Sequence, residues 1–264
     1  MTECNGASRV ALVTGAARGI GRGIAVRLAA DGLDVAVNDI EENENELEEV
    51  AESVRGAGRR ALTVTADVSD PGEVEGMVGR VTDELGRLDV MVANAGIAQV
   101  KPILEITPED FDGLMSVNLR GVFLCYQAAA RQMIRQGSGG KIIGAASIAA
   151  HKGFAMLGHY SASKWAVRGL TQAAAQEWAE YGITVNAYCP GIVGTAMWDL
   201  IDEKLAEHMG LQKGEALQQY SELIALGRVE EPEDVAAFVS YLASRDSDYM
   251  TGQSVMIDGG IIFS

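Results

Sequence analysis

The stretch Thr14-Gly15-Ala16-Ala17-Arg18-Gly19-Ile20-Gly21 decides the fold of this chain. It directly follows a short apolar run, Arg9–Val13, and a helical pattern of apolar residues starts after it at Ile24. Glycines let a backbone turn tightly and approach a pyrophosphate, whose charge is favoured at the positive end of a helix. The spacing Gly-x-x-x-Gly-x-Gly differs from the general Gly-x-Gly-x-x-Gly fingerprint, yet its setting between strand and helix predicts a nucleotide-binding turn. The expected contacts are Gly15, Arg18, Gly19, Ile20 and Gly21.

Strand-length apolar runs alternate with helical patterns along the rest of the chain. Further strands are expected at Asp34–Asp39, Ala61–Ala66, Leu88–Ala93, Lys141–Ala146, Ile183–Tyr188 and Ser254–Ile257. Helices are expected at Glu41–Glu52, Pro71–Leu85, Pro108–Arg135, Tyr160–Ala179 and Pro232–Leu242. This alternation predicts an α/β fold: a single doubly wound Rossmann-type domain, residues 1–264, with a seven-stranded parallel sheet. The stretch from 195 to 226 breaks the alternation and is expected to form a small helical lobe over a pocket.

Composition excludes several classes of partner. The 264 residues include 37 acidic and 21 basic ones, for a net charge of −16. Such a surface repels nucleic acid and anionic lipid, and no apolar run approaches the ~20 residues of a membrane span. The start of the chain lacks the plan of a signal peptide. The three cysteines have neither metal-ligand nor disulfide spacing, which indicates reduced thiols in a cytoplasmic protein without a metal.

Polar or turn-forming residues stand where six of the expected strands end. In doubly wound sheets, ligands bind at the carboxyl ends of the strands. The residues at these ends are Gly15, Asp39, Asp67, Asn94, Ser147 and the pair Pro190-Gly191. Any one of them alone is an ordinary loop residue, but together they outline a cleft.

Asp39 indicates which dinucleotide this cleft holds. It ends the second strand, 18 positions past Gly21, where a carboxylate accepts hydrogen bonds from the adenosine ribose hydroxyls of NAD. A 2′-phosphate at ~4 Å would be repelled by about 4 kcal/mol at an effective dielectric of ~20. Arg18 could bind a 2′-phosphate, which is weak evidence for NADP(H). The alternative interpretation of Asp39 is an ordinary turn residue at a strand end. We predict NAD(H) rather than NADP(H).

Tyr160 and Lys164 are four residues apart in Tyr160-Ser161-Ala162-Ser163-Lys164. On a helix this spacing places both side chains on one face, one turn apart. A phenol with a pKa of ~10 is a poor acid or base at neutral pH, and a fixed ammonium nearby favours the phenolate. The pair therefore predicts general acid–base chemistry with a lowered tyrosine pKa.

Taken as an ordered set, these motifs closely resemble the short-chain dehydrogenase/reductase family. The residues that carry the resemblance are Thr14-Gly15-x-x-x-Gly19-x-Gly21, Asn94-Ala95-Gly96, Asn118, Ser147, Tyr160-x-x-x-Lys164 and Pro190-Gly191. The resemblance implies hydride transfer at a nicotinamide, with Tyr160 as proton donor and acceptor. Ser147 is expected to hydrogen-bond the substrate oxygen, Lys164 to assist Tyr160 and hold the ribose, and Asn118 to anchor a proton-relaying water.

The resemblance also implies the remaining cofactor contacts. Asp67 and Val68 are expected at the adenine, Asn94 at the ribose, and Val193 and Thr195 at the carboxamide. The other implied cofactor-binding residues are Ile40, Ala95, Gly96, Pro190 and Gly191. One departure is visible before the catalytic serine, where Gly144-Ala145-Ala146-Ser147 replaces the Ser-Ser pair of many relatives.

The C-terminal half resembles the acetoin/diacetyl reductases (meso-2,3-butanediol dehydrogenases) of that family. This likeness rests on Tyr188–Val193, Thr195-x-Met197-Trp198, Ser240–Ser244 and Asp246–Gln253, and it implies a small ketone or hydroxyketone substrate. The expected substrate contacts are Ser147, Ile148, Phe154, Tyr160, Met197 and Trp198. Ile148, Phe154 and Met156 are apolar, which suits a bulkier ketone if they line the pocket rather than pack the lobe.

Several alternatives stay open. A 3-oxoacyl-carrier-protein reductase shares the catalytic residues, although the net charge and Asp39 oppose it. A sugar-alcohol dehydrogenase and a nucleotide-binding scaffold without turnover are the others. The resemblance implies a homotetramer. His159 points about 100° away from Tyr160 on a helix and is interpreted as a lobe or interface residue, and Cys189 as a small buried filler.

Overall fold

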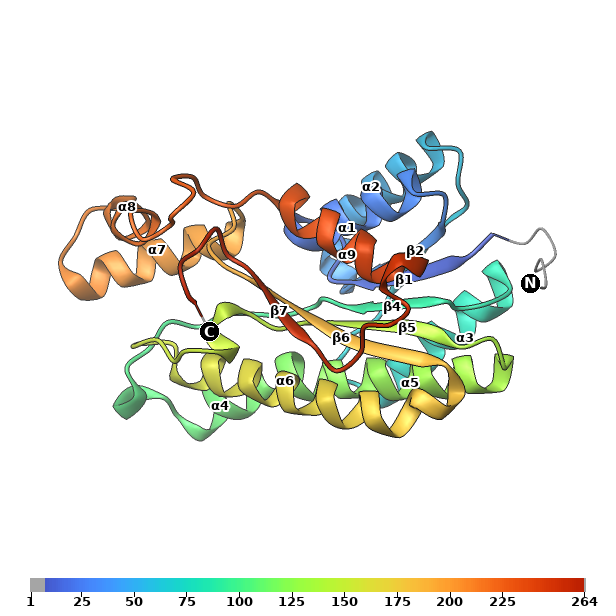
Figure 1. Cartoon of the computed structure of the whole chain (residues 1–264). Coiled ribbons are helices and arrows are strands. Elements are labelled where there is room, and N and C mark those ends of the chain that lie inside the picture. The colour runs from blue at the N-terminus through green and yellow to red at the C-terminus, as the bar shows by residue number, and fades with distance from the viewer. Residues whose placement is uncertain (1–7, 264) are drawn as a thin grey trace.

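A seven-stranded parallel sheet forms the centre of the molecule (Figure 1). The computed structural model describes residues 8–263, and the sheet has the strand order β3-β2-β1-β4-β5-β6-β7. The strands are β1 (Val10–Thr14), β2 (Asp34–Asp39), β3 (Ala61–Thr65), β4 (Val90–Ala93), β5 (Gly140–Ala145), β6 (Ile183–Pro190) and β7 (Ser254–Ile257). The predicted fold class is confirmed. The largest shifts are in β4, which begins at Val90 rather than Leu88, and in β6, which continues to Pro190.

Helices cover both faces of this sheet (Figure 1). On one face lie α1 (Gly19–Ala30), α2 (Glu44–Gly56) and α9 (Pro232–Ala243), and on the other α3 (Pro71–Leu85), α4 (Pro108–Met115), α5 (Val122–Gln136) and α6 (Gly158–Trp178). Strands buried on both faces read as continuous apolar runs, and Val10–Val13 is accordingly fully buried. The strand order reverses between β1 and β4, so the ends of these two strands open into a crevice.

The long helix predicted over Pro108–Arg135 is wrong in its middle. Between α4 and α5 the chain forms a π-helical segment, Ser116–Gly121, a wider turn that often occurs at functional sites. The Asn118 side chain holds this turn by hydrogen bonds to the backbone of Ile97. Gly121 leaves no space for a side chain there, because an added Cβ would lie 2.8 Å from Val68 Cγ2. These partners are distant in sequence, so a helical pattern alone does not reveal the widening.

The predicted helical lobe consists of α7 (Ala196–Met209) and α8 (Glu215–Ser221), which project beyond the sheet (Figure 1). It has a small core of its own, built on Ile201, Leu205 and Ala216. The buried carboxylate of Asp202 joins the two helices by accepting hydrogen bonds from the backbone amides of Gly214 (2.6 Å) and Leu217 (2.7 Å). The lobe is thus a defined unit rather than an irregular loop.

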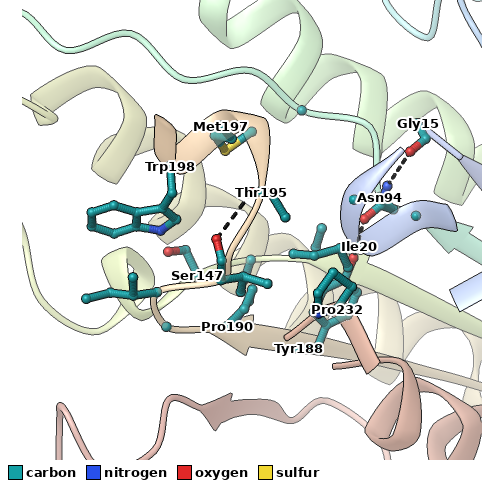
Figure 2. Close-up of a pocket in the computed structure, with 18 of the residues that line it drawn as sticks. Gly15, Ile20, Asn94, Ser147, Tyr188, Pro190, Thr195, Met197, Trp198 and Pro232 are labelled. Carbon is teal, nitrogen blue, oxygen red and sulfur yellow. Dashed lines mark hydrogen bonds between the residues drawn. The ribbon is translucent and has the colours of Figure 1, made fainter. Parts of the chain in front are cut away.

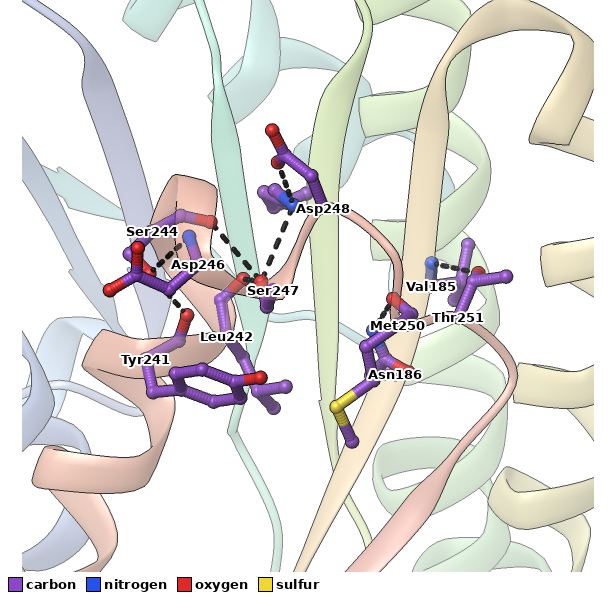
Figure 3. A network of polar contacts seen from close by, with 11 residues as sticks. Val185, Asn186, Tyr241, Leu242, Ser244, Asp246, Ser247, Asp248, Met250 and Thr251 are labelled. Atoms are coloured by element: carbon purple, nitrogen blue, oxygen red, sulfur yellow. Dashed lines mark hydrogen bonds and ion pairs between the residues drawn. The ribbon is translucent and has the colours of Figure 1, made fainter.

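The loop between α9 and β7 docks the last strand onto the sheet (Figure 3). The Asn186 amide of β6 donates to the Met250 carbonyl (2.8 Å), and Thr251 Oγ1 accepts from the Val185 amide (3.0 Å). At the start of the loop, Asp248 pairs with the buried Lys141 of β5 (2.7 Å). The motif over Asp246–Gln253 therefore has a structural task at the sheet, away from the carboxyl-end crevice.

Cys125 and Cys189 are buried free thiols, as the sequence indicates, while Cys4 lies outside the described residues. Burial raises the pKa of each of the two buried thiols to about 12, so both stay protonated at neutral pH. Among the described residues, no helix is long and apolar enough to cross a membrane, and no cluster of side chains is suited to a metal ion.

Gly144 on β5 packs directly against a buried side chain and yields a stability prediction. A Cβ at this position would lie 2.1 Å from the hydroxyl of the buried Tyr126. We expect Gly144→Ala to lower the free energy of unfolding by about 1–3 kcal/mol through overpacking, measured by urea denaturation. Adding Tyr126→Phe removes the closest atom and should restore part of the loss. Gly113→Ala, on an exposed helical site with open space, is the control; an equal loss there would contradict this reading.

Candidate active site

One large cavity of about 1410 Å³ opens at the carboxyl ends of the strands. Of the predicted site residues, all except Asn118 line it. Figure 2 shows Gly15, Ile20 and Asn94 on one side of the cavity, Ser147, Met197 and Trp198 on the other, and Thr195 between them. The topology therefore brings together residues that are up to about 180 positions apart in the chain, as parallel strand ends at a switch point must.

The glycine-rich turn forms the wall beside β1. Gly15 and Gly19 have φ values of +63° and +54°, which favour glycine, and a Cβ on Gly21 would lie 2.1 Å from the Gly15 carbonyl oxygen. No side chain caps the start of α1 at Arg18, so the first amides of this helix remain available to an anion. This cradle fits a pyrophosphate, and the residues present fit a dinucleotide.

Asn94 braces that turn rather than standing free in the cavity. Its amide nitrogen donates to the carbonyls of Thr14 (2.7 Å) and Gly15 (3.0 Å). Its oxygen accepts from the Tyr188 hydroxyl (2.7 Å), and Figure 2 shows the three groups in line. Tyr188 was not among the predicted site residues, although it ends a predicted strand and begins the stretch Tyr188–Val193 that carries the family likeness.

The Asp39 carboxylate is held in one orientation at the end of β2. One oxygen accepts from the Ala17 amide (3.1 Å), and the other from the Ile40 amide (3.0 Å) and the Asn43 side chain (2.8 Å). Arg18, which lines the same cavity, is exposed. A fixed carboxylate thus stands beside the glycine turn as predicted.

Tyr160, Lys164 and Ser147 meet at the other end of the cavity. Tyr160 and Lys164 lie one turn apart on α6, with Lys164 Nζ 5.5 Å from the centre of the phenol ring. The buried ammonium donates to the Ala145 carbonyl (2.9 Å). The Ser147 hydroxyl, at the end of β5, accepts from the Ala149 amide (3.1 Å). A phenol, a hydroxyl and a cation thus line the same end of the cavity.

The protonation of this group differs from the sequence expectation. Burial raises the pKa of Tyr160, and a hydrogen bond with Ser147 opposes the rise only in part. The prediction of a lowered tyrosine pKa is therefore wrong for this arrangement, in which the ammonium bonds the Ala145 carbonyl. Burial also lowers the pKa of Lys164 to about 8. At pH 7 the phenol is protonated and the amine is predominantly charged.

Asn118 does not face the cavity. Its side chain is fully buried and is occupied by the amide of Ile97 (2.8 Å) and the carbonyl of Ile97 (2.9 Å). It lies instead beneath Gly96, where an added Cβ would meet Asn118 Oδ1 at 3.3 Å and Lys164 Nζ at 3.6 Å. The side chain thus supports the backbone that faces Lys164.

Apolar side chains surround the end of the cavity beyond Ser147. Ile148, Phe154, Met197 and Trp198 line it as predicted, and Trp198 packs against Tyr220 with ring centres 6.1 Å apart. Sequence reasoning missed Leu157, Tyr220, Leu223 and the C-terminal segment 260–263, which also line this end. These residues carry no motif. Met156, expected on the wall, packs against the lobe instead.

Glu230 is a buried acid beneath the loop that starts at Pro190, and sequence reasoning missed it. One carboxyl oxygen accepts from the Gly191 amide (3.0 Å), and the other is buried without a hydrogen-bond partner. Burial raises the pKa of Glu230 to about 8, with Asp234 and Asp258 adding to the rise. The carboxyl is therefore mostly protonated at pH 7, which lowers the cost of its burial.

A Rossmann-type crevice with a phenol, an amine and a hydroxyl at its far end defines the class of nicotinamide-dependent oxidoreductases. Residues 15–262 match a family model described as enoyl-(acyl carrier protein) reductase. An L-2,3-butanediol dehydrogenase of Corynebacterium glutamicum is 51% identical over 257 residues, covering 97% of this chain and 100% of that protein. A diacetyl reductase [(S)-acetoin forming] of Staphylococcus epidermidis is 49% identical, covering 97% and 99%.

The solved structures that resemble this chain include members of the same class of enzymes. A short-chain type dehydrogenase/reductase from Mycobacterium marinum has a TM-score of 0.87 at 39% identity, covering 98% of this chain and 97% of that one. Levodione reductase has a TM-score of 0.89 at 35% identity, covering 96% and 97%. The chain belongs to the short-chain dehydrogenase/reductase family. It is an oxidoreductase that acts on secondary alcohols or the corresponding ketones with a nicotinamide cofactor.

Glu230 gives a prediction for pH. Its pKa is raised in the folded protein, so between pH ~4.5 and ~8 the folded state binds a proton that the unfolded state has lost, and stability falls as pH rises. Relative to the wild type, Glu230→Gln should gain on the order of 3 kcal/mol in unfolding free energy between pH 5 and 8, measured by urea denaturation. Glu177→Gln, at an exposed site on α6, should show no such trend. A flat difference for Glu230→Gln would refute the protonated carboxyl.

Proposed function

We propose that this protein is an NAD(H)-dependent oxidoreductase that interconverts a small ketone or hydroxyketone of the acetoin/diacetyl type with its secondary alcohol. The observation that carries the proposal is the convergence of Tyr160, Ser147 and Lys164 at the end of the cavity away from the glycine turn. Relatives named L-2,3-butanediol dehydrogenase and diacetyl reductase, at 51% and 49% identity, support the substrate class.

Tyr160 acts as the general acid in the reducing direction. Its raised pKa keeps the phenol protonated at neutral pH, which is the form that donates a proton to a carbonyl oxygen. Ser147 orients that oxygen by a hydrogen bond and stabilises the charge that develops on it. When bound, the nicotinamide supplies or accepts the hydride. In the oxidising direction the same phenol, ionised, takes the proton from the alcohol.

Lys164 lowers the free-energy cost of ionising the Tyr160 phenol. With a pKa of about 8, the amine is mostly positive at pH 7, and it lies one turn from Tyr160 over the face of the ring. A cation at this distance favours the phenolate that remains after proton donation. The same ammonium group is positioned to hold ribose hydroxyls. Water relay near Asn118, implied by the family resemblance, remains part of the proposal, with the side chain acting through Ile97 and Gly96.

The cofactor contacts follow from the two fixed walls of the cavity. The open amides at the start of α1 hold the pyrophosphate, and Asp39 accepts hydrogen bonds from the adenosine ribose. The remaining contacts are assigned to Ile40, Asp67, Val68, Ala95, Gly96, Pro190, Gly191, Val193 and Thr195, all of which line the cavity. Because the Asp39 carboxylate is held in place by three hydrogen bonds, it cannot turn away from a 2′-phosphate, which supports NAD over NADP.

The proposal includes a homotetramer in the cytoplasm. Phe123 on α5 and Trp165 on α6 are 42% and 47% exposed, which supports packing of these helices against a second copy. Sedimentation velocity measures the assembly directly, and a monomer at micromolar concentration would remove this part of the proposal.

Tyr160→Phe removes the proton donor and leaves the ring. We expect turnover of diacetyl to fall at least ~10²-fold, in line with contributions of general acids, while the Kd for NADH is unchanged. Stopped-flow absorbance at 340 nm and fluorescence titration measure the two quantities. Retained turnover would rule out Tyr160 as the acid.

Asp39→Asn keeps the shape of the side chain and removes its charge. We expect the ratio of kcat/KM with NADH to that with NADPH to fall at least ~10-fold, because a repulsion of a few kcal/mol with the 2′-phosphate is lost. Glu46→Gln, on the exposed face of α2, makes the same change in net charge and should leave the ratio as it is. An unchanged ratio in Asp39→Asn would contradict the NAD assignment.

The function itself is tested by initial rates with diacetyl, acetoin and an acetoacetyl thioester, each with NADH and NADPH. Fast turnover of the first two with NADH supports the proposal. The acyl-carrier alternative, towards which the description of the family model points, requires the thioester and is disfavoured by the net charge of −16. Preference for the thioester with NADPH would replace the proposal. Activity only on polyols would favour a sugar-alcohol dehydrogenase, and cofactor binding without any turnover would favour a nucleotide-binding scaffold.

A further inference from the structure

A chain of four side chains crosses from the loop after β4 to the first turn of α6, behind the wall of the cavity. Lys101 Nζ donates to one oxygen of Asp110 (2.5 Å), and Gln99 Nε2 donates to the other (2.7 Å). Gln99 Oε1 contacts Nε2 of His159 (2.8 Å). His159 is 2% exposed and immediately precedes Tyr160. It is therefore buried within the chain, in contrast to its interpretation from the sequence as a lobe or interface residue.

The hydrogen-bond directions in this chain fix the tautomer of His159. Hydrogen bonds from Lys101 and Gln99 lower the pKa of Asp110, so its carboxylate is ionised and only accepts. Gln99 must then turn its NH₂ group to Asp110 and its oxygen to His159. The imidazole therefore carries its proton on Nε2. Nδ1 is buried without a hydrogen-bond partner, and burial lowers the pKa of His159, so the ring is neutral.

This chain reinforces a strained part of the backbone. Met156 has a φ of +66° and is the non-glycine residue with positive φ among residues 8–263. Such a conformation persists only where neighbours hold it. Its carbonyl accepts from the Lys101 amide (2.8 Å), and a Cβ on Gly158 would lie 2.8 Å from Ile103 Cγ1. No side chain caps the start of α6. The segments 99–103 and 156–159 are thus joined by two hydrogen bonds and approach each other closely at Gly158.

We propose that His159, through its Nε2–H bond to Gln99, is a positioning residue for the ketone. The bond fixes the first turn of α6, and with it both Tyr160 and the wall residues Phe154 and Leu157. The inference rests on the proposed function of Tyr160. The glycine turn and Asp39 stand on β1, β2 and α1, which this chain does not touch. Loss of the bond therefore misplaces the phenol relative to the ketone and leaves intact the contacts to the pyrophosphate and the adenosine, which carry most of the cofactor affinity in this proposal.

The experiment compares His159→Leu and Gln99→Leu with His159→Gln, whose side-chain amide can still donate to Gln99. For the two leucine variants we expect kcat/KM for diacetyl to fall about 10- to 100-fold, the scale of small misplacements of reacting groups, with the Kd for NADH unchanged. His159→Gln should recover most of the loss. The double leucine variant should lose no more than either single one, because both remove the same bond.

Thr171→Val is the matched control for stability. Thr171 is fully buried on the same helix, and its hydroxyl hydrogen-bonds that of Tyr126 (3.0 Å). This variant should lower Tm in the manner of His159→Leu and leave kcat/KM and both KM values as in the wild type. If Thr171→Val lost as much activity as His159→Leu, or if His159→Gln recovered nothing, the role of His159 would be only structural.

Amide hydrogen exchange tests the same bond without activity. In His159→Leu and Gln99→Leu, peptides over 97–103 and 154–161 should exchange faster, whereas His159→Gln and Thr171→Val should retain protection there. Unchanged exchange in both leucine variants overturns the inference. If the wild type reduces no ketone, the proposed function fails, and exchange alone decides whether the bond holds these segments. Should His159→Leu fail to fold, Gln99→Leu provides the same comparison.

Discussion

The hydrogen bonds between Thr14 and Asn94 are the constraint on which the site depends. Thr14 Oγ1 accepts from the amides of Asn94 (3.0 Å) and Ala95 (3.1 Å), and the Asn94 side chain returns a bond to the Thr14 carbonyl (2.7 Å). These bonds join the ends of β1 and β4 where the strand order reverses. The glycine turn follows β1 on one side of this junction, and Gly96, which faces Lys164, follows β4 on the other. Both halves of the cavity therefore take their position from one junction.

Burial sets the protonation of Tyr160 and Lys164. It raises the pKa of Tyr160 and lowers that of Lys164 to about 8, because a low-dielectric site disfavours the charged form of each. The phenol is thereby kept protonated at neutral pH, and the Ala145 carbonyl compensates part of the cost of burying the ammonium. The same effect protonates Glu230 under the loop at Gly191. Ionisation at this site is governed by desolvation first and by neighbouring charges second.

The two ends of the cavity are held by different kinds of structure. The nucleotide end stands on strands and on α1, where backbone amides form the cradle and the Asn94 side chain braces it. The ketone end is formed by the lobe, by Phe154 and Leu157 next to the strained Met156, and by the C-terminal segment. Side-chain bonds such as that between Gln99 and His159 replace ladder hydrogen bonds there.

The sequence by itself determined what local periodicity encodes: the strands and helices along the chain, the glycine turn, Asp39 at the end of β2, and Tyr160 and Lys164 one turn apart. Side chains at these positions are placed by their own element, so spacing suffices. Only the tertiary structure decided contacts between residues far apart in the chain. Tyr188 reaches Asn94 across 94 positions and His159 reaches Gln99 across 60, and the π-helical turn at Asn118 and the raised pKa of Tyr160 have the same origin. A side chain becomes buried and meets partners from distant parts of the chain only when the elements pack together. A local sequence pattern therefore does not predict these contacts.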